Sequence, residues 1–275
     1  IVGHSGFGST LYLKEVWPQA RFLGYFEWFY RTTGSDVGFG EASPVSPDTA
    51  CRVHTYNAPI VMDLALSDRA LCPTRWQASQ FPEALQRQLS VVFDGIDTDA
   101  FQPLQPEQRA EGLRIGDLHI AADVPLVTYT TRGFEPYRGW PQVAEGLSLL
   151  MQRNPQVQVL LVGSDEVAYG AARGDGRSWR QWAMDSFDYD RSRLHWLPPL
   201  QYTDYRRVLQ QSWVHVYWTI PFILSWGLME ALSTGCCVVA SNTPPVQEVI
   251  QPGEQGVLVD FFDPDGLAAR VDELL

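Results

Sequence analysis

Short, nearly continuous apolar runs recur through the second half of this 275-residue chain and constrain its fold more than any other feature. Strands covered on both faces have continuous apolar sequences rather than alternating ones, so each run predicts a buried strand of a parallel sheet. The six runs are Pro125–Tyr129, Val157–Val162, Leu194–Leu197, Val214–Trp218, Cys236–Ala240 and Gly256–Asp260.

Amphipathic stretches with helical spacing separate several of these runs. They are Trp140–Gln152, Tyr202–Gln211, Gly227–Thr234 and the shorter Pro244–Ile250. A strand followed by a helix, repeated along the chain, is typical of a parallel sheet with helices on both faces. The pattern therefore predicts a doubly wound α/β domain that begins near residue 118 and extends to residue 275.

The first part of the chain has a less regular pattern. Phe22–Phe26 and Leu89–Phe93 predict strands, and Ala58–Leu71 predicts a helix. Thr32–Pro47 is rich in Gly, Ser, Pro and Asp, and predicts a long loop of the kind that is often functional. Gln102–Gly116 is polar and holds two prolines, so it is the candidate linker between two domains.

Composition and charge exclude several classes of protein. A hydrophobic content of 45% and a charged content of 19% allow a sizeable core and argue against global disorder. The net charge of −12, from 20 basic and 32 acidic residues, argues against a nucleic-acid binder and gives no support to a polybasic membrane anchor. No apolar run reaches the roughly 18 residues that a transmembrane segment needs.

The ends of the chain and its cysteines bear on where the protein acts. No signal peptide precedes the first strand, and the chain stops within a helical pattern. We interpret it as a fragment that lacks the start of its N-terminal domain and its C-terminal end. The four cysteines include no C-x-x-C pair, which favours free thiols in a reducing compartment. We expect a cytoplasmic protein, with peripheral membrane contact through the missing region as the alternative.

The opening GHSGFG is similar to the nucleophile elbow of a hydrolase, but the match fails. The elbow requires glycine two positions after the serine, whereas Phe7 stands at that distance from Ser5 and the glycine is displaced to Gly8. The chain also lacks G-x-G-x-x-G, a P-loop and H-E-x-x-H, and its five histidines have no metal-binding spacing. We expect no metal site.

The stretch TRGFEPYRGW follows the strand that is expected to end near Tyr129. It places Arg132 and Arg138 on one strand-to-helix loop. The neighbouring Gly133 and Gly139 allow the backbone to approach a ligand closely. Two guanidinium groups on such a loop suit a bidentate grip on phosphate oxygens. The alternative is a pair of solvated surface arginines.

The stretch PFILSWGLMEALSTG predicts a second strand-to-helix junction. Its helix begins near Ser225, with Gly227 in the first turn, and a helix N-terminus beside a glycine presents backbone N–H groups to an anion. Glu230 follows one turn later, where its carboxylate can accept hydrogen bonds from sugar hydroxyls. The alternative role for Glu230 is a helix-dipole or capping-box acid.

Taken together, these stretches resemble a known family. VVFDGIDTDAFQP, near the end of the first part, resembles the "NGVD…F.P" segment of the family 4 (group 1) glycosyltransferases, which are retaining enzymes of the GT-B fold. TRGFEPYRGW is similar to their "R…KG" loop. PFILSWGLMEALSTGCCVVASNTPPVQEVIQPGEQGVLVD is similar to their "GL..lEAma.G.PVva" unit and the "E.i..g..G.lv" after it. The order and spacing of the three stretches make the resemblance specific.

The resemblance implies two Rossmann-like domains with parallel sheets and a nucleotide-sugar site at the cleft between them. We expect residues 1–104 to be the partial N-terminal acceptor domain and residues 105–275 to be the C-terminal donor domain. The implied donor is a nucleotide diphosphate sugar, and the implied acceptor is a hydroxyl group of a saccharide or glycolipid. Retaining members of this kind work without a metal, and no cofactor is expected.

The resemblance also implies roles for individual residues. The expected catalytic residues are His4, Arg132, Arg138 and Glu230. The expected donor-binding residues are Gly133, Leu197, Ser225, Gly227, Leu228 and Glu230. The two arginines and the helix N–H groups would neutralise the diphosphate, the glutamate would hold the ribose hydroxyls, and the chain near Leu197 would border the base. His4 and Glu27 would lie on the acceptor side.

The chain departs from the family pattern in two places. The family has an E-x7-E pair, but Phe222 stands eight positions before Glu230. Arg138 replaces the lysine of the phosphate loop.

The expected reaction is transfer of a hexose-type unit with retention at the anomeric carbon, driven mainly by electrostatic stabilisation of the departing diphosphate. The alternatives are a non-catalytic nucleotide-sugar-binding module and an epimerase or phosphorylase on the same fold.

Overall fold

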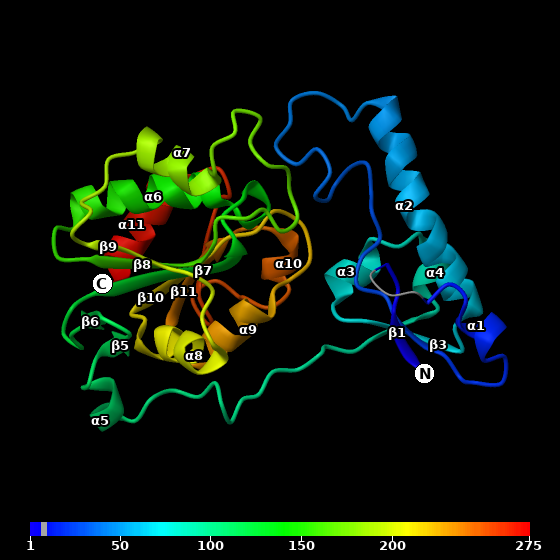
Figure 1. Cartoon of the computed structure of the whole chain (residues 1–275), viewed down its shortest axis with the longest axis horizontal. Helices are drawn as coiled ribbons and strands as arrows, with labels where there is room; N and C mark the ends of the chain where they lie inside the picture. Colours follow the sequence, from blue (N-terminus) through cyan, green and yellow to red (C-terminus); the bar gives the residue numbers. More distant parts are fainter. Residues whose placement is uncertain (7–9) are drawn as a thin grey trace. The chain divides into compact units, whose positions relative to one another are not determined.

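The computed structural model describes residues 1–6 and 10–275, which form two compact units (Figure 1). The first unit comprises Ile1–Gly95 together with Pro221–Leu224. The second unit comprises Ile96–Ile220 together with Ser225–Leu275. The chain thus passes into the second unit at Gly95, before the boundary expected at residue 104.

The first unit is built on a parallel sheet of four short strands in the order β1-β2-β3-β4. The strands are β1 (Val2–His4), β2 (Leu23–Tyr25), β3 (Arg69–Cys72) and β4 (Leu89–Val91). The helices are α1 (Leu13–Val16), α2 (Pro47–Leu66), α3 (Arg75–Ser79) and α4 (Glu83–Gln86). A core packs α2 against the sheet, and its buried members are Phe26, Ile60, Leu64, Ala70, Cys72 and Phe81.

The helix predicted over Ala58–Leu71 is wrong at both ends. Helix α2 begins earlier because Ser46 caps it: the Ser46 Oγ accepts the N–H of Thr49 at 3.2 Å, and Pro47 fits the first helical position. At Ser67 the backbone becomes extended, which ends the helix and starts the strand β3 that the sequence did not reveal. The loop expected before α2 is present, without helix or strand from residue 32 to residue 46.

The second unit holds a six-stranded parallel sheet in the order β12-β11-β10-β7-β8-β9. Its strands are β7 (Leu126–Gly133), β8 (Gln158–Ser164), β9 (Leu194–Leu197), β10 (Val214–Tyr217), β11 (Cys237–Ser241) and β12 (Val257–Val259). Each of the six predicted strands is present. Most side chains of β7, β8, β10 and β11 are buried, as continuous apolar runs require, whereas the edge strands β9 and β12 are only partly buried.

Helices cover both faces of this sheet (Figure 1). They are α6 (Trp140–Arg153), α7 (Trp179–Ser186), α8 (Tyr202–Gln211), α9 (Trp226–Ser233), α10 (Pro244–Gln247) and α11 (Pro264–Leu274). Helices α6, α7 and α11 lie on one face, and α8 and α9 lie on the other. The predicted doubly wound α/β domain is therefore confirmed.

The segment predicted as a linker, Gln102–Gly116, is folded. It contributes α5 (Pro106–Arg109) and β5 (Leu113–Ile115), and β5 pairs antiparallel with β6 (Leu118–Ile120). The chain is fixed just before this segment because Phe101 is fully buried and packs edge-on against Tyr202 at 5.0 Å. Burying an aromatic ring of this size attaches the segment to the second unit.

The strand order creates a topological switch point between β7 and β10. From β7 the chain continues outward through β8 and β9, and it then returns to β10 on the other side of β7. The loops that follow β7 and β10 therefore diverge, and in sheets of this kind the crevice at such a point is where ligands bind.

Helix α11 offers a modest test of the fold. Its N-cap residue Asp263 accepts the N–H of Gly266 at 2.8 Å. We expect Asp263→Ala to lower the free energy of unfolding by about 1 kcal/mol in urea denaturation. Asp263→Asn keeps a capping oxygen and should remain close to wild type. An equal loss in both variants would mean that the charge, rather than the cap, stabilises the helix.

Candidate functional site

The chain leaves β7 through a tight turn, η1 (Pro136–Arg138), before α6 begins. Gly139 completes this turn with a φ of 62°, in the left-handed region. A Cβ at Gly139 would lie 2.2 Å from Cδ1 of Trp218, the residue after β10. Only glycine fits there, so the loops after β7 and β10 are held in direct contact.

Arg138 occupies the centre of this contact and is only 9% exposed. Its Nη1 donates to Oγ1 of Thr219 at 3.0 Å, and its guanidinium lies 5.3 Å from the ring centre of Tyr169. Burial raises the pKa of Tyr217, and the positive charge of Arg138 acts in the opposite direction. The Tyr217 Oη in turn accepts the N–H of Ser225 at 3.0 Å. Arg138 and the start of α9 are thus joined across the end of β10.

Arg132 differs from Arg138, because its side chain is exposed at the end of β7. Within residues 1–6 and 10–275 it makes no side-chain hydrogen bond or ion pair. The alternative of a solvated surface arginine therefore describes Arg132 in this structure, whereas Arg138 is built into the fold. The adjacent Gly133 is required by close packing, since a Cβ there would lie 2.1 Å from the carbonyl oxygen of Glu166.

Glu135 is a buried residue beside the candidate site, and the sequence analysis did not single it out. Its carboxylate is fully buried and accepts the N–H groups of Tyr169 at 3.0 Å and Gly170 at 2.7 Å. These bonds hold the loop after β8 against the turn Pro136–Gly139, which contains Arg138 and is called the arginine turn below. The Tyr169 ring stacks there with that of Tyr137. The acid in the otherwise basic and aromatic stretch TRGFEPYRGW could have indicated this role. A carboxylate that is buried in the fold must accept hydrogen bonds from nearby donors.

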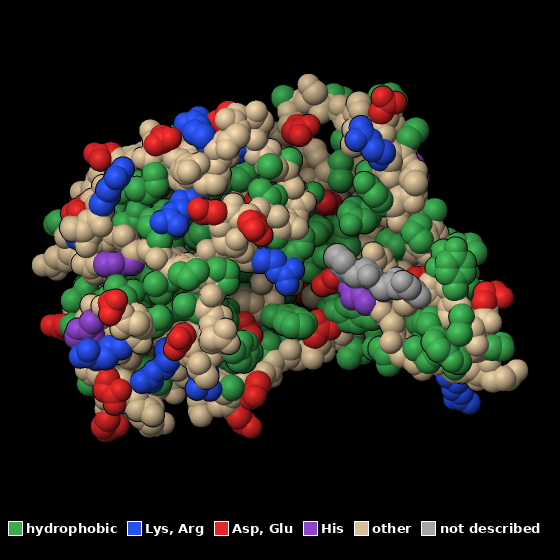
Figure 2. Space-filling model, in the orientation of Figure 1, with side chains coloured by type: hydrophobic (Ala, Val, Ile, Leu, Met, Phe, Trp, Pro, Cys, Tyr) green, Lys and Arg blue, Asp and Glu red, His purple; other side chains and the backbone are tan. Residues whose placement is uncertain are grey.

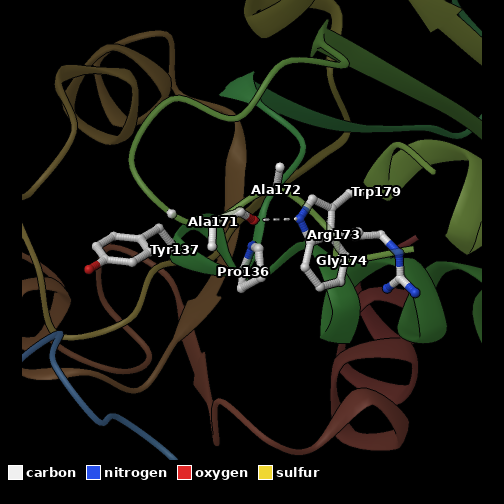
Figure 3. Close-up of a pocket in the computed structure, with 8 residues that line it drawn as sticks. Pro136, Tyr137, Ala171, Ala172, Arg173, Gly174 and Trp179 are labelled. Carbon is white, nitrogen blue, oxygen red and sulfur yellow. Dashed lines mark hydrogen bonds between the residues drawn. The ribbon is translucent and has the colours of Figure 1, made fainter. Parts of the chain in front are cut away.

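A pocket of about 440 Å³ lies beside the same turn (Figure 3). Tyr137 and Trp179 stand on opposite sides of it, and Ala171 lies between them. The Trp179 Nε1 donates to the carbonyl oxygen of Ala171 at 3.3 Å, which fixes the wall of the pocket. The complete lining is Pro136, Tyr137, Gly170, Ala171, Ala172, Arg173, Gly174 and Trp179.

The start of α9 is closed by its own cap. The Ser225 Oγ accepts the N–H of Gly227 at 3.2 Å, and the Ser225 carbonyl oxygen accepts the N–H of Leu228 at 3.2 Å. The two N–H groups expected to face the diphosphate are therefore bonded within the first turn. What α9 contributes in this structure is the positive end of its dipole.

Glu230 is held on α9 with only 6% of its surface exposed. Tyr202 donates to its Oε1 at 2.8 Å, and Tyr205 donates to its Oε2 at 2.9 Å. Burial and the acceptor Glu230 together raise the pKa of Tyr202. The capping-box alternative is wrong, because the carboxylate turns toward α8 and the N–H of Ser225 is bonded to Tyr217.

Leu197 closes β9 and is half-buried against the core between the sheet and α8. Its neighbour Trp196 packs edge-on against Phe134 at 5.1 Å, and the guanidinium of Arg180 lies 4.4 Å from the Trp196 ring centre. Aromatic packing therefore fixes the position of this part of the chain. That it borders a base stays a prediction.

The first unit brings His4 and Glu27 together. The His4 Nε2 and the Glu27 Oε2 are 3.1 Å apart, at the ends of the neighbouring strands β1 and β2. Both residues line a cavity of about 200 Å³. Its other lining residues are Ser5, Gly6, Trp28, Tyr30, Thr55, Tyr56, Pro59 and Ile60.

Two further positions from the sequence analysis also lie in this unit. Ser5 donates to a side-chain oxygen of the buried Asp63 at 2.7 Å; Phe7 and Gly8 lie outside the described residues. Phe222, at the place of the first family glutamate, is buried 5.0 Å from the ring centre of Trp28. An aromatic ring that packs in the core therefore takes the place of the family carboxylate at position 222.

The surface of the second unit carries both signs of charge. On the face drawn in Figure 2, basic and acidic side chains are interspersed over this unit rather than gathered into a field of one sign. Several are paired, as in the contacts of Arg173 and Arg177 with Asp175 at 2.7 and 2.8 Å. Among the helices of the described residues, none has the length and apolar character that crossing a bilayer requires.

Known glycosyltransferases are similar to both parts of this chain. Residues 1–101 match the glycosyl transferase family 4 group, and residues 124–275 match the glycosyl transferases group 1. The chain is 29% identical over 226 residues to a phosphatidyl-myo-inositol mannosyltransferase of Mycolicibacterium smegmatis, which covers 80% of this chain and 50% of the relative. The chain thus spans about half the length of that curated relative.

Solved structures share the fold. Anabaena HepE in complex with UDP-glucose superposes with a TM-score of 0.68 at 15% identity, over 93% of this chain and 62% of that one. Sucrose-phosphate synthase from Thermosynechococcus elongatus gives 0.66 at 21% identity, over 100% of this chain and 63% of that one. The expected GT-B fold is confirmed, and the chain belongs to the group 1 glycosyltransferases.

Proposed function

We propose that this chain is part of an enzyme that transfers a sugar from a nucleotide diphosphate sugar to a hydroxyl acceptor, with retention at the anomeric carbon. One observation carries the proposal: the switch point joins Arg138, the end of β10 and the start of α9, with Glu230 one turn further on. Family membership supports a nucleotide sugar as the ligand, because a crevice at a switch point is by itself compatible with many kinds of ligand.

The donor diphosphate would lie over the turn after β7. Arg138 supplies a guanidinium whose position is fixed by Thr219 and Tyr169, so little ordering is needed when phosphate oxygens bind. Arg132 can reach the same anion from solvent, and the dipole of α9 adds positive potential. These fixed charges would stabilise the diphosphate as it departs, which is the main catalytic effect proposed and needs no metal.

The acceptor would bind in the first unit at the His4–Glu27 pair. The His4 imidazole can hold a hydroxyl proton while Glu27 orients the ring, and the aromatic residues of the cavity offer apolar faces to a saccharide or to the head group of a glycolipid. The name of the mannosyltransferase relative supports a hexose donor and a lipid acceptor. The cytoplasmic location stays a prediction.

Turnover by the full-length protein tests this proposal. Radiolabelled UDP-glucose and GDP-mannose are incubated with saccharide and glycolipid acceptors, and the anomeric proton of the product is examined by NMR. Retention gives an α-linked product from these α-linked donors, whereas a β-linked product would contradict the retaining assignment. Binding without turnover would favour a nucleotide-sugar-binding module, and an isomerised sugar or phosphate-dependent cleavage would favour an epimerase or a phosphorylase.

A further inference from the structure

The carboxylate of Glu230 is already occupied on both oxygens in this structure. The hydroxyl of Tyr202 donates to Oε1 at 2.8 Å, and the hydroxyl of Tyr205 donates to Oε2 at 2.9 Å. Tyr202 and Tyr205 are three positions apart on α8, so one face of that helix presents both hydroxyls to α9. A ligand hydroxyl that binds Glu230 must therefore either displace one of these two donors or bind beside them.

The two tyrosines are held very differently. Tyr205 lies on the inner side, where a Cβ at Gly227 would come within 3.1 Å of its hydroxyl oxygen. Tyr202 is the first residue of α8 and is 56% exposed, although Glu230 beneath it is 6% exposed. The ends of a helix fray more readily than its interior, so Tyr202 is easier to displace than Tyr205, which lies one turn further in. Tyr202 is thus the outer, removable cover of the carboxylate.

Access decides which donor a ligand meets. A carboxylate can accept about four hydrogen bonds, so two places remain on Glu230 in principle. Its small exposed fraction shows that protein atoms cover most of these places. Of the two tyrosines bonded to the carboxylate, Tyr202 is the exposed one, and its ring centre lies 5.0 Å from that of Phe101. A hydroxyl arriving from solvent therefore meets Tyr202 before it meets Tyr205.

We propose that Tyr202 is a specificity-determining cover, which hydrogen-bonds Glu230 in the free protein and is displaced from it by the ribose of the bound nucleotide. This inference rests on the proposed nucleotide-sugar function. A ribose hydroxyl replaces the tyrosine hydroxyl on the same acceptor, so the number of hydrogen bonds to Glu230 is conserved. A ligand without ribose hydroxyls cannot make this exchange and leaves Tyr202 in place.

Removal of the tyrosine hydroxyl should therefore strengthen nucleotide binding. In Tyr202→Phe the ribose no longer competes for Glu230, and we expect UDP or GDP to bind the full-length protein roughly two- to tenfold more tightly by calorimetry. The matched 2′,3′-dideoxy nucleotide should bind wild type and variant equally. Tyr205→Phe, which removes the inner hydroxyl, should not tighten binding.

A second measurement follows the side chain directly. In protein labelled with 3-fluorotyrosine, the ¹⁹F resonance that is missing from Tyr202→Phe should shift when UDP or GDP is added, and it should not shift with the dideoxy analogue. Unchanged or weaker nucleotide binding by Tyr202→Phe would overturn the inference, and so would an unmoved Tyr202 resonance. The proposed function would survive that result if wild type still discriminates against the dideoxy nucleotide. It would fall if wild type binds neither UDP nor GDP.

Discussion

Replacement of Arg138 by alanine is expected to weaken nucleoside diphosphate binding by about 1.5–3 kcal/mol, or roughly 10- to 150-fold, as measured by calorimetry. The range is that of charge-assisted hydrogen bonds. The full range applies because Arg138 is 9% exposed and its charge is little screened by solvent. The loss should be as large for the free nucleoside diphosphate as for the nucleotide sugar, since both carry the same phosphates.

Arg132→Ala is the matched comparison for this result. Arg132 belongs to the same loop but is exposed, so its interaction with an anion is screened by salt. We expect a smaller loss of affinity than for Arg138→Ala, and one that disappears at high ionic strength. Thermal unfolding of both variants separates binding from folding, because Arg138 also bonds Thr219. An Arg138→Ala protein that is folded and binds within twofold of wild type would contradict the diphosphate role.

The second unit could be predicted from sequence because its strands are buried on both faces. Six apolar runs mark six strands without ambiguity, and the helices between them keep a regular apolar spacing. Helix α2 was harder to predict from apolar spacing, because the first half of the helix is largely exposed and its start depends on the cap at Ser46. The linker prediction failed for a related reason: Phe101 is one buried ring next to a polar segment.

The candidate site could be predicted only in part. Arg138 and Glu230 are marked by local motifs, so sequence alone makes them candidates, and their roles stay predictions. Their partners are not marked, because Thr219 and Tyr169 come from loops after other strands and become neighbours only when the sheet is assembled. For the same reason the sequence gives no sign that Tyr202 covers Glu230. Contacts between residues distant in the chain depend on strand order, which apolar runs alone do not determine.

Glu230→Gln separates a ribose-binding role from a structural one. If Glu230 acts only within the structure, through the hydrogen bonds it accepts from Tyr202 and Tyr205, the change should lower stability by about 1–3 kcal/mol and leave nucleotide affinity unchanged. If its carboxylate also accepts ribose hydroxyls, the folded variant should in addition bind the nucleotide about 1–3 kcal/mol more weakly.

The 2′,3′-dideoxy nucleotide is the matched control for Glu230→Gln, because it carries the same base and phosphates and lacks the hydroxyl donors. Wild type should discriminate against it, since only ribose hydroxyls can take the place of Tyr202 on the nearly buried carboxylate. Glutamine keeps the shape of the side chain but replaces one acceptor oxygen with a donor group, so the variant should discriminate far less. Equal discrimination by the two proteins would show that Glu230 does not touch the ribose. The nucleotide would then have to be held by the arginine turn alone, without any group on α9 that distinguishes a ribose.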